Sequence, residues 1–213
     1  MLRLHYIPTS AAMAAHAALA EAGADYELAL VERNERDESP PEYLKINPWG
    51  RVPTLEDDDL VVTESAAIVL HVGDRFPESG LVPPVGTPER TLVYRRLIFL
   101  TNTLQTALMR WFYPDRYTID PAGEDALRAR AAEDIRGIYD QLEGDLEGRE
   151  WILGDSRTGA DLYLFMLTRW GRFQEPAAWD RPNLRAHFLR SLELPGVRRM
   201  VEEQELDLPE FSS

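Results

Sequence analysis

Along the N-terminal part of the chain, the spacing of hydrophobic residues changes from a strand pattern to a helix pattern and back to a strand pattern. Leu2, Leu4 and Tyr6 alternate with polar residues, which is the pattern of a strand with two different faces. An alanine-rich stretch over 11–22 favours a helix, and a glycine follows it as a stop signal. Apolar residues return over 26–31 and predict a second strand. A strand, a helix and a strand within about thirty residues predict a βαβ unit with a parallel pair of strands.

The elements that follow are shorter. A helix that opens with proline is predicted over 40–46, because proline is tolerated in the first helical turn. Two apolar runs at 54–55 and 60–62 flank an acidic turn and predict a hairpin. A further helix is predicted over 64–76. Together these elements predict an α/β domain, in the order βαβ-α-ββα, over residues 1–77.

The rest of the chain has a helical pattern. Residues 78–88 are dense in proline and glycine, so we expect them to form a linker between domains. Apolar residues recur at helical spacing over 89–116 and again over 124–148. Residues 89–213 are therefore predicted to form an all-α helical bundle domain.

The segment 47–68 carries the most specific chemistry. Val52 precedes Pro53, and a bond of this kind can be cis, which leaves the Val52 backbone free to pair with an extended ligand. A helix that begins at Ser65 offers N–H groups and a partial positive charge to a carboxylate, and Glu64 offers a carboxylate to an ammonium. These groups together fit a short peptide with a free amino-acid head group. For each piece taken alone, a structural turn and an ordinary helix start are the alternative interpretation.

Two motifs resemble the cytosolic glutathione S-transferase family, in a bacterial form. The first is Asn-Pro-x-Gly-x-Val-Pro at 47–53, followed by a hairpin and then by Glu64 and Ser65. The second is Gly-Asp-x-x-Thr-x-Ala-Asp at 154–161, whose threonine and second aspartate form a capping box that predicts a helix start. The resemblance covers nearly the whole chain. It implies a thioredoxin-like N-terminal domain, a helical C-terminal domain, glutathione as co-substrate and a homodimer.

The resemblance also implies which residues bind glutathione. The backbone of Val52 is expected to pair with the cysteinyl part, and Pro53 is expected to be cis. Glu64 and Ser65 are expected to hold the γ-glutamyl head group. Arg51 lies beside them and can meet the glycyl carboxylate, although a solvated arginine is the alternative interpretation.

The group that would activate the thiol is less obvious. A free thiol has a pKa of about 8.5, and lowering it to about 6.5 is worth roughly 2.7 kcal/mol. Relatives that use serine or cysteine for this task carry it at the position of Ala11, which has no side-chain donor. The candidates that remain are Ser10, Tyr6 and Thr9. Ser10 is otherwise a plain helix cap, and Tyr6 is otherwise a half-buried strand residue. The backbone N–H groups of 10–12 are a further option.

The pocket for the electrophile is expected in the helical domain. Arg110, Trp111 and Tyr113 belong to the densest aromatic cluster of the chain, and Trp170 is expected on another wall. Aromatic side chains also dominate helix packing and dimer contacts, so either role is the alternative interpretation. The two arginines of this region, Arg110 and Arg116, would favour an acidic or polar substrate.

Composition narrows the range of possible functions. The net charge of −14 disfavours binding to nucleic acid or to a membrane surface. With no cysteine, the chain has no disulfide, no thiolate ligand and no mechanism through a protein thiol. Its four histidines are scattered, so we expect no metal site. Neither a signal peptide nor a membrane-spanning run is visible, and a cytoplasmic protein is predicted.

The predicted function is a detoxifying glutathione S-transferase that conjugates glutathione to a small electrophile. A non-catalytic protein that binds glutathione or a hydrophobic ligand is one alternative, and Ala11 and Ala12 are its main support. A glutathione-dependent isomerase or ether-cleaving relative is another. It would share the first chemical step and differ only in the pocket.

Overall fold

Four strands form one sheet in the part of the chain that the computed structural model describes, residues 1–208. The strands are β1 (Leu2–Tyr6), β2 (Tyr26–Leu30), β3 (Thr54–Asp57) and β4 (Leu60–Thr63). Their order is β2-β1-β3-β4, with β1 parallel to β2 and with the other two pairs antiparallel. The predicted βαβ unit and the predicted hairpin are therefore confirmed.

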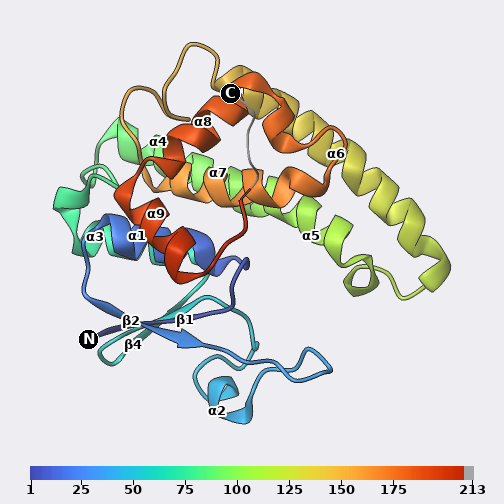
Figure 1. Ribbon diagram of the computed structural model, residues 1–213, viewed down its shortest axis with the longest axis horizontal. Helices are drawn as coiled ribbons and strands as arrows, with labels where there is room; N and C mark the ends of the chain where they lie inside the picture. The colour runs from blue at the N-terminus through green and yellow to red at the C-terminus, as the bar shows by residue number, and fades with distance from the viewer. Residues whose placement is uncertain (209–213) are drawn as a thin grey trace. The chain divides into compact units, whose positions relative to one another are not determined.

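Helices lie on both faces of this sheet. They are α1 (Ala12–Glu21), α2 (Pro41–Leu44) and α3 (Ser65–Arg75). α1 and α3 pack against each other on the face that buries Leu2 and Leu4 (Figure 1). The strand alternation turns His5 to the opposite face, where its ring lies 5.3 Å from the ring of Tyr43 in α2. This is the thioredoxin-like arrangement that the sequence predicts.

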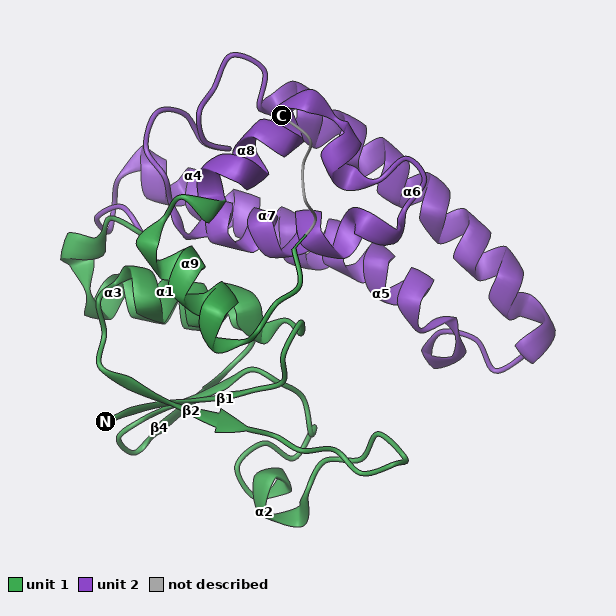
Figure 2. Ribbon diagram, viewed as in Figure 1, with its two compact units in different colours: residues 1–81, 192–213 green, residues 82–191 purple. Residues whose placement is uncertain are grey.

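The C-terminal helix α9 (Pro195–Glu203) packs against α1. It groups with the sheet in one compact unit, unit 1, made of residues 1–81 and the segment that starts at 192 (Figure 2). The Gly196 N–H donates to the Glu21 carboxylate at 2.7 Å, and Val197 and Met200 are fully buried.

These boundaries differ from the predicted ones at the C-terminus, where all of 89–213 was assigned to the helical domain. The cause is a set of contacts between residues far apart in the sequence, which leave no local pattern. The division between the units falls between residues 81 and 82, inside the stretch 78–88 that was predicted to be a linker. The end of the predicted helical domain, residues 209–213, lies outside the described residues.

Unit 2, residues 82–191, is helical (Figure 2). Its helices are α4 (Pro88–Phe99), α5 (Thr106–Phe112), α6 (Glu124–Asp145), α7 (Gly159–Trp170) and α8 (Pro182–Leu192). Every residue of α7 is buried, which makes it the central helix of the unit. The ring of Phe165 in α7 stacks on the ring of Phe188 in α8, with centroids 4.6 Å apart.

The long helix predicted over 89–116 is interrupted. A π-helical segment, Leu100–Gln105, joins α4 to α5. The Thr106 hydroxyl donates to the Thr101 carbonyl at 3.1 Å, and such side-chain bonds compete with the regular helical register. The helix then ends at Phe112, two residues before Pro114, because a proline disfavours helical geometry in the residue that precedes it.

The capping box predicted at the start of α7 is confirmed. The Thr158 hydroxyl accepts from the Ala160 N–H, and the Asp161 carboxylate accepts from the Thr158 N–H at 2.7 Å. Asp161 does more than start the helix, since its second oxygen accepts from the Ile152 N–H at 2.8 Å and lies 3.0 Å from His187 Nε2. It therefore joins three segments of unit 2.

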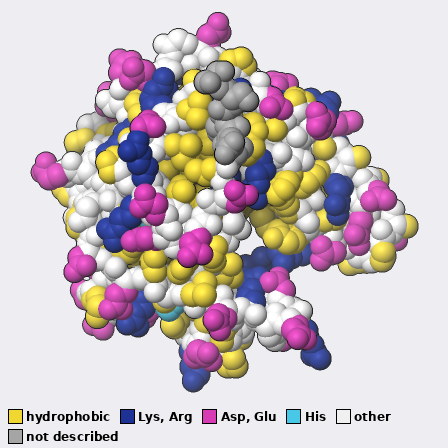
Figure 3. Space-filling view, viewed as in Figure 1, with side chains coloured by type: hydrophobic (Ala, Val, Ile, Leu, Met, Phe, Trp, Pro, Cys, Tyr) yellow, Lys and Arg dark blue, Asp and Glu magenta, His cyan; other side chains and the backbone are white. Residues whose placement is uncertain are grey.

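Acidic side chains account for the surface charge. On the face shown in Figure 3 they are spread over the molecule among arginines and apolar groups, and they do not gather in one patch. On this face, acidic groups spread in this way give general repulsion of anions without a local acidic site.

Candidate functional site

The turn between β1 and α1 holds Ser10 as a helix cap. The Ser10 hydroxyl donates to the Ile7 carbonyl at 2.6 Å and accepts from the Ala12 N–H at 3.1 Å. A hydroxyl has one proton, and here Ile7 receives it. Thr9 beside it has φ +62°, a left-handed conformation that non-glycine residues rarely adopt. The turn is thus tightly constrained, and its hydroxyl group is occupied within the protein.

Ala11 supplies a free backbone donor at the same place. The Ser10 N–H donates to the Ile7 carbonyl at 3.3 Å, and the Ala12 N–H is taken by the Ser10 hydroxyl. Within residues 1–208, the Ala11 N–H has no hydrogen-bond partner. It lies at the positive end of the α1 dipole, so it can donate to an anion.

The N-terminus of α3 lies against this turn. The buried Ser65 hydroxyl donates to the Ala11 carbonyl at 2.7 Å. Glu64, which precedes the helix, has φ +68° and ψ +114°, a strained conformation for a residue with a side chain, and its side chain is exposed. Because the first N–H groups of a helix have no intrahelical partner, the ends of α1 and α3 place two sets of donors close together.

The loop before β3 leaves Val52 unpaired. The Val52–Pro53 peptide bond is cis, as predicted. Thr54 pairs with His5 at the last position of the β1–β3 ladder, and Val52 lies beyond it. In the described part of the chain, neither the N–H nor the C=O of Val52 makes a hydrogen bond to the protein. An extended peptide can therefore pair with this residue as a short additional strand.

Three buried polar residues fix the position of this loop. Asn47 Nδ2 donates to the Arg51 carbonyl at 2.8 Å and to Thr54 Oγ1 at 3.1 Å. The Tyr43 hydroxyl donates to the same carbonyl and lies 2.8 Å from Thr54 Oγ1. Burial raises the pKa of Tyr43, which keeps the phenol protonated as a donor. The backbone of Arg51, the residue before Val52, is thus held through its carbonyl, while the Arg51 side chain is exposed.

Sequence reasoning missed two of these residues. Asn47 belongs to the motif, but Tyr43 and Thr54 were assigned no role. Their signal was weak, because a tyrosine in a short amphipathic helix and a threonine in a strand are ordinary components of a fold. Only the folded structure brings Tyr43 of α2 to the Arg51 carbonyl and Thr54 of β3 to the Tyr43 hydroxyl.

Tyr6 ends β1 and is half-buried. Its ring lies 6.3 Å from the ring of His16 in α1, in an edge-on arrangement. His16 is fully buried and lies 2.8 Å from the Glu203 carboxylate and 3.0 Å from the Tyr26 hydroxyl. Burial lowers the pKa of His16, against the opposing effect of Glu203. Tyr6 therefore rests on a polar cluster that connects α1, β2 and α9.

The residues predicted for the electrophile pocket are only partly brought together. The Phe112 ring lies 5.0 Å from Trp111, 6.2 Å from Tyr113 and 6.3 Å from Trp170, all within unit 2. Arg110 is not part of this ring cluster in the contacts of the described residues. Its guanidinium lies 4.0 Å from the Asp134 carboxylate of α6, and its Nε is buried without a partner.

Phe173 completes the aromatic cluster. Its ring lies 5.9 Å from Phe112, and the guanidinium of Arg172 lies 3.9 Å above it. Arg116 stacks in the same way over Tyr113, at 4.0 Å. No local pattern in the sequence marks Phe173, which follows the central helix by a few residues and is not part of the aromatic run.

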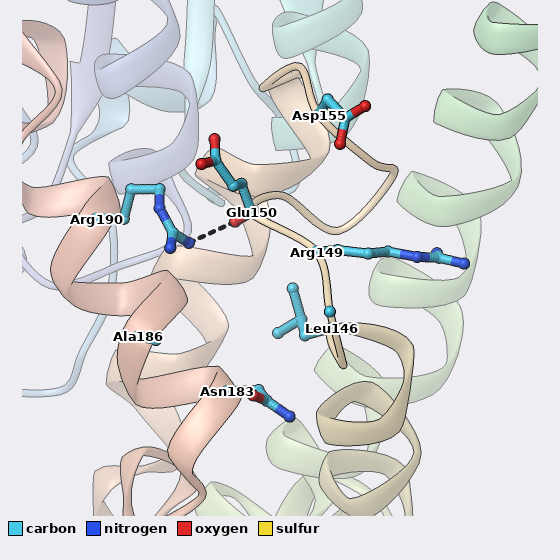
Figure 4. Close-up of a pocket in the computed structure, with 8 residues that line it drawn as sticks. Leu146, Arg149, Glu150, Asp155, Asn183, Ala186 and Arg190 are labelled. Carbon is cyan, nitrogen blue, oxygen red and sulfur yellow. Dashed lines mark hydrogen bonds between the residues drawn. The ribbon is translucent and has the colours of Figure 1, made fainter.

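One cleft of unit 2 contains none of the predicted residues. It measures about 560 Å³ and lies between the end of α6 and α8. Figure 4 shows that Arg190 donates to the Glu150 carbonyl, whereas Arg149 extends away from both. Because the polar groups do not converge on one point, this cleft lacks the arrangement of a specific binding site.

Among residues 1–208, no three His, Cys, Asp or Glu side chains are placed to hold a metal ion together. None of the helices in that range combines the length and the apolar character that crossing a bilayer requires.

The fold and the site together define a class. A sheet unit with a cis proline beside an unpaired backbone residue is followed in the chain by a helical unit, and the unpaired backbone suits an extended peptide ligand. Two family models match the chain, one described as the N-terminal domain of glutathione S-transferase, over residues 2–74, and one as its C-terminal domain, over residues 92–195. The chain belongs to the glutathione S-transferase family.

Named relatives agree with this assignment. A protein of Xanthomonas campestris named glutathione S-transferase GST-4.5 is 32% identical over 173 residues, which is 79% of this chain and 82% of the relative. Glutathione S-transferase GstA of Escherichia coli O157:H7 is 28% identical and covers 96% of this chain and 100% of its own. The predicted family and the predicted class of enzyme, glutathione transferase, are confirmed.

Solved structures agree as well. A sphingomonad glutathione S-transferase in complex with glutathione matches with a TM-score of 0.82 at 31% identity, covering 96% of this chain and all of the other. A transferase homologue from Sulfitobacter with bound glutathione matches with a TM-score of 0.86 at 27% identity, covering 97% and 99%. The predicted fold class is confirmed.

Proposed function

We propose that this chain binds glutathione in unit 1, stabilises its thiolate and conjugates it to a small electrophile. The observation that supports this most is a set of unpaired backbone groups in one unit, at Val52, at Ala11 and at the start of α3. The relatives that were solved with bound glutathione add independent support.

Each part of glutathione has a candidate partner. The cysteinyl backbone pairs with Val52, whose position is fixed through the Arg51 carbonyl. The γ-glutamyl carboxylate accepts from the N-terminus of α3 at Ser65, and the γ-glutamyl ammonium meets the Glu64 carboxylate. Pro53 sets the direction of the loop, and Arg51, with its exposed side chain, is the candidate for the glycyl carboxylate.

The thiolate is stabilised mainly by the Ala11 N–H and by the α1 dipole. The Ser10 hydroxyl serves Ile7, so it would need to rotate before it could donate to sulfur. Tyr6 and Thr9 remain side-chain candidates. A charge-assisted bond from a backbone donor is worth about 1.5–3 kcal/mol, which is close to the roughly 2.7 kcal/mol needed for two pKa units.

Binding assays with a shorter peptide test the head-group assignment. Cysteinylglycine lacks the γ-glutamyl part, so Glu64→Gln should weaken glutathione binding about tenfold and leave cysteinylglycine binding unchanged. Asp59→Asn, in the exposed β3–β4 turn, is the matched control. An equal loss for both peptides in Glu64→Gln would contradict the assignment.

A second function is favoured by one specific observation. Ala11 and Ala12 carry no side-chain donor, and the Ser10 hydroxyl is already engaged, so a site in which the backbone N–H of Ala11 is insufficient would bind glutathione without ionising it. Such a protein would be a non-catalytic binding member of the family. Binding at neutral pH without a thiolate signal separates this function from the transferase.

We further propose a homodimer, because closed two-fold dimers are the common assembly of such proteins. Sedimentation at several protein concentrations tests it, and a single monomeric species at all concentrations would contradict it. We also propose that the electrophile pocket of the transferase is walled by Trp111, Tyr113 and Trp170. The cytoplasmic location stays a prediction.

A further inference from the structure

A small cleft in unit 2 is lined by three aromatic rings. It measures about 200 Å³ and lies between α5, α6 and the segment that follows α7. The rings of Trp111, Tyr139 and Phe173 line it. Ala132 of α6 lines it as well and leaves room between the rings. Such walls favour a flat, apolar ligand over a flexible chain.

One buried polar group at this cleft has no partner. Gln174 lines the cleft and is 8% exposed. Its amide nitrogen is buried and makes no hydrogen bond within the described residues. A buried donor without a partner is unfavourable, so an acceptor atom of a ligand in the cleft would recover that free energy.

Positive charge surrounds the same cleft. Arg136 lines it and donates to the Glu175 carbonyl at 3.1 Å. Arg128 lies 6.0 Å from the Trp111 ring, and Arg172 lies 3.9 Å from the Phe173 ring. Glu175 is the only carboxylate among the residues that line the cleft, and it is exposed. The lining itself carries one guanidinium and one carboxylate, and the guanidinium groups of Arg136, Arg128 and Arg172 near its rings can pair with an anion.

The size of the cleft limits the ligand. Sites for drug-sized molecules measure about 300–1,000 Å³, so about 200 Å³ suits a single ring with a small substituent. We propose that this cleft binds a small aromatic carboxylate, with its ring between Trp111 and Phe173 and its carboxylate facing the Gln174 amide and the Arg136 guanidinium. The cleft lies within unit 2 and shares Trp111 with the proposed electrophile pocket, whereas the inference does not depend on the proposed glutathione site in unit 1.

Calorimetric titration of the full chain with benzoate tests the proposal, with benzyl alcohol and cyclohexanecarboxylate as comparison ligands. Benzoate should bind at least about tenfold more tightly than either, because one lacks the charge and the other lacks the flat ring. Saturating glutathione should leave benzoate binding unchanged. Competition by glutathione would place the benzoate in another site and overturn the proposal.

Two variants locate the binding. Ala132→Leu fills the cleft and should weaken benzoate binding more than tenfold, whereas Ala129→Leu, on an exposed position of the same helix, should leave it unchanged. Gln174→Leu removes the donor and should weaken benzoate binding about tenfold, with little effect on benzyl alcohol. Circular dichroism checks that each variant is folded.

If Ala132→Leu fails to fold, the benzoate affinity of Gln174→Leu decides the test. Benzoate binding that is unchanged in a folded Ala132→Leu or in Gln174→Leu would overturn the proposal. Equal affinity for benzoate and benzyl alcohol in the unmodified chain would overturn its charge component.

Discussion

At the scale of single residues, the site depends on which groups the protein leaves without partners. The sequence predicts a cis bond at Pro53 and a helix start at Ser65, since proline and helix-start signals act locally. It cannot tell that the Ser10 hydroxyl donates to Ile7, or that Ala11 keeps a free N–H, because both depend on how the turn closes. These backbone groups, more than any side chain, carry the proposed chemistry.

Ser10→Ala separates a capping role from a catalytic one. Loss of the cap should lower the free energy of unfolding by about 1 kcal/mol, which urea denaturation measures. The pKa of bound glutathione should change little, because the Ala11 N–H remains. If the thiolate signal disappears in this variant while stability holds, Ser10 is the activating group and the backbone account is wrong.

Asn47→Ala tests the support of the loop at Val52. The change leaves the buried Arg51 carbonyl with one donor fewer and should lower the free energy of unfolding by about 1–3 kcal/mol. Glutathione affinity should fall as well, since Val52 loses its fixed position. Asn102→Ala, at an exposed position of unit 2, is the control. Unchanged glutathione affinity in Asn47→Ala would contradict the positioning role.

At the scale of elements, α9 is the part that the sequence could not place. The sequence predicts that residues 89–213 are helical but not which surface α9 covers, and here it covers α1. Three connections hold it there: the Gly196 N–H on Glu21, the buried Met200, and the polar cluster at His16. Because α1 carries the proposed thiolate site at its other end, the stability of this packing matters to function.

Gly196→Ala tests this contact. A Cβ at Gly196 would lie 2.3 Å from the backbone nitrogen of Glu21, so α9 must shift, at a cost of about 1–3 kcal/mol or more. Gly144→Ala in α6 is the matched control, because nothing lies within 4 Å of its new Cβ. It should stabilise unit 2 by about 0.5–1 kcal/mol. Urea denaturation measures both, and equal effects would contradict the close packing.

The His16 cluster should make stability depend on pH. Burial lowers the pKa of His16 in the folded state, so the unfolded chain takes up its proton first as the pH falls below about 6.5, and stability is lost there. Burial raises the pKa of Glu203, but hydrogen bonds from Arg199, His16 and Tyr26 outweigh this and leave it lowered, which adds a further loss at lower pH.

His16→Gln removes the first titration and keeps a donor for Glu203. Between pH 7.5 and pH 5.5, its free energy of unfolding should fall less steeply than that of the unmodified chain, although it should be lower at neutral pH. Urea denaturation at a series of pH values measures the slope. Identical slopes would show that His16 does not carry this pH dependence.

At the scale of the whole molecule, local sequence patterns were sufficient to predict the order of the elements in the N-terminal domain, the strands of the sheet and the start of α7. They failed where distant segments decide the outcome: the grouping of α9 with the sheet, the π-helical segment before α5, and the position of Arg110 beside Asp134, apart from the aromatic cluster. The chemistry of unit 1 was more predictable than that of unit 2, because its motif is continuous in the sequence.

The central claim is that unit 1 both binds and ionises glutathione. The most direct test is the ultraviolet difference spectrum of glutathione bound to the full chain across a pH titration, with S-methylglutathione as the blank. The account predicts a thiolate band that persists at neutral pH and titrates well below the free value of about 8.5. Binding without that band until the pH reaches the free value would contradict it and leave a glutathione-binding protein without the transferase step.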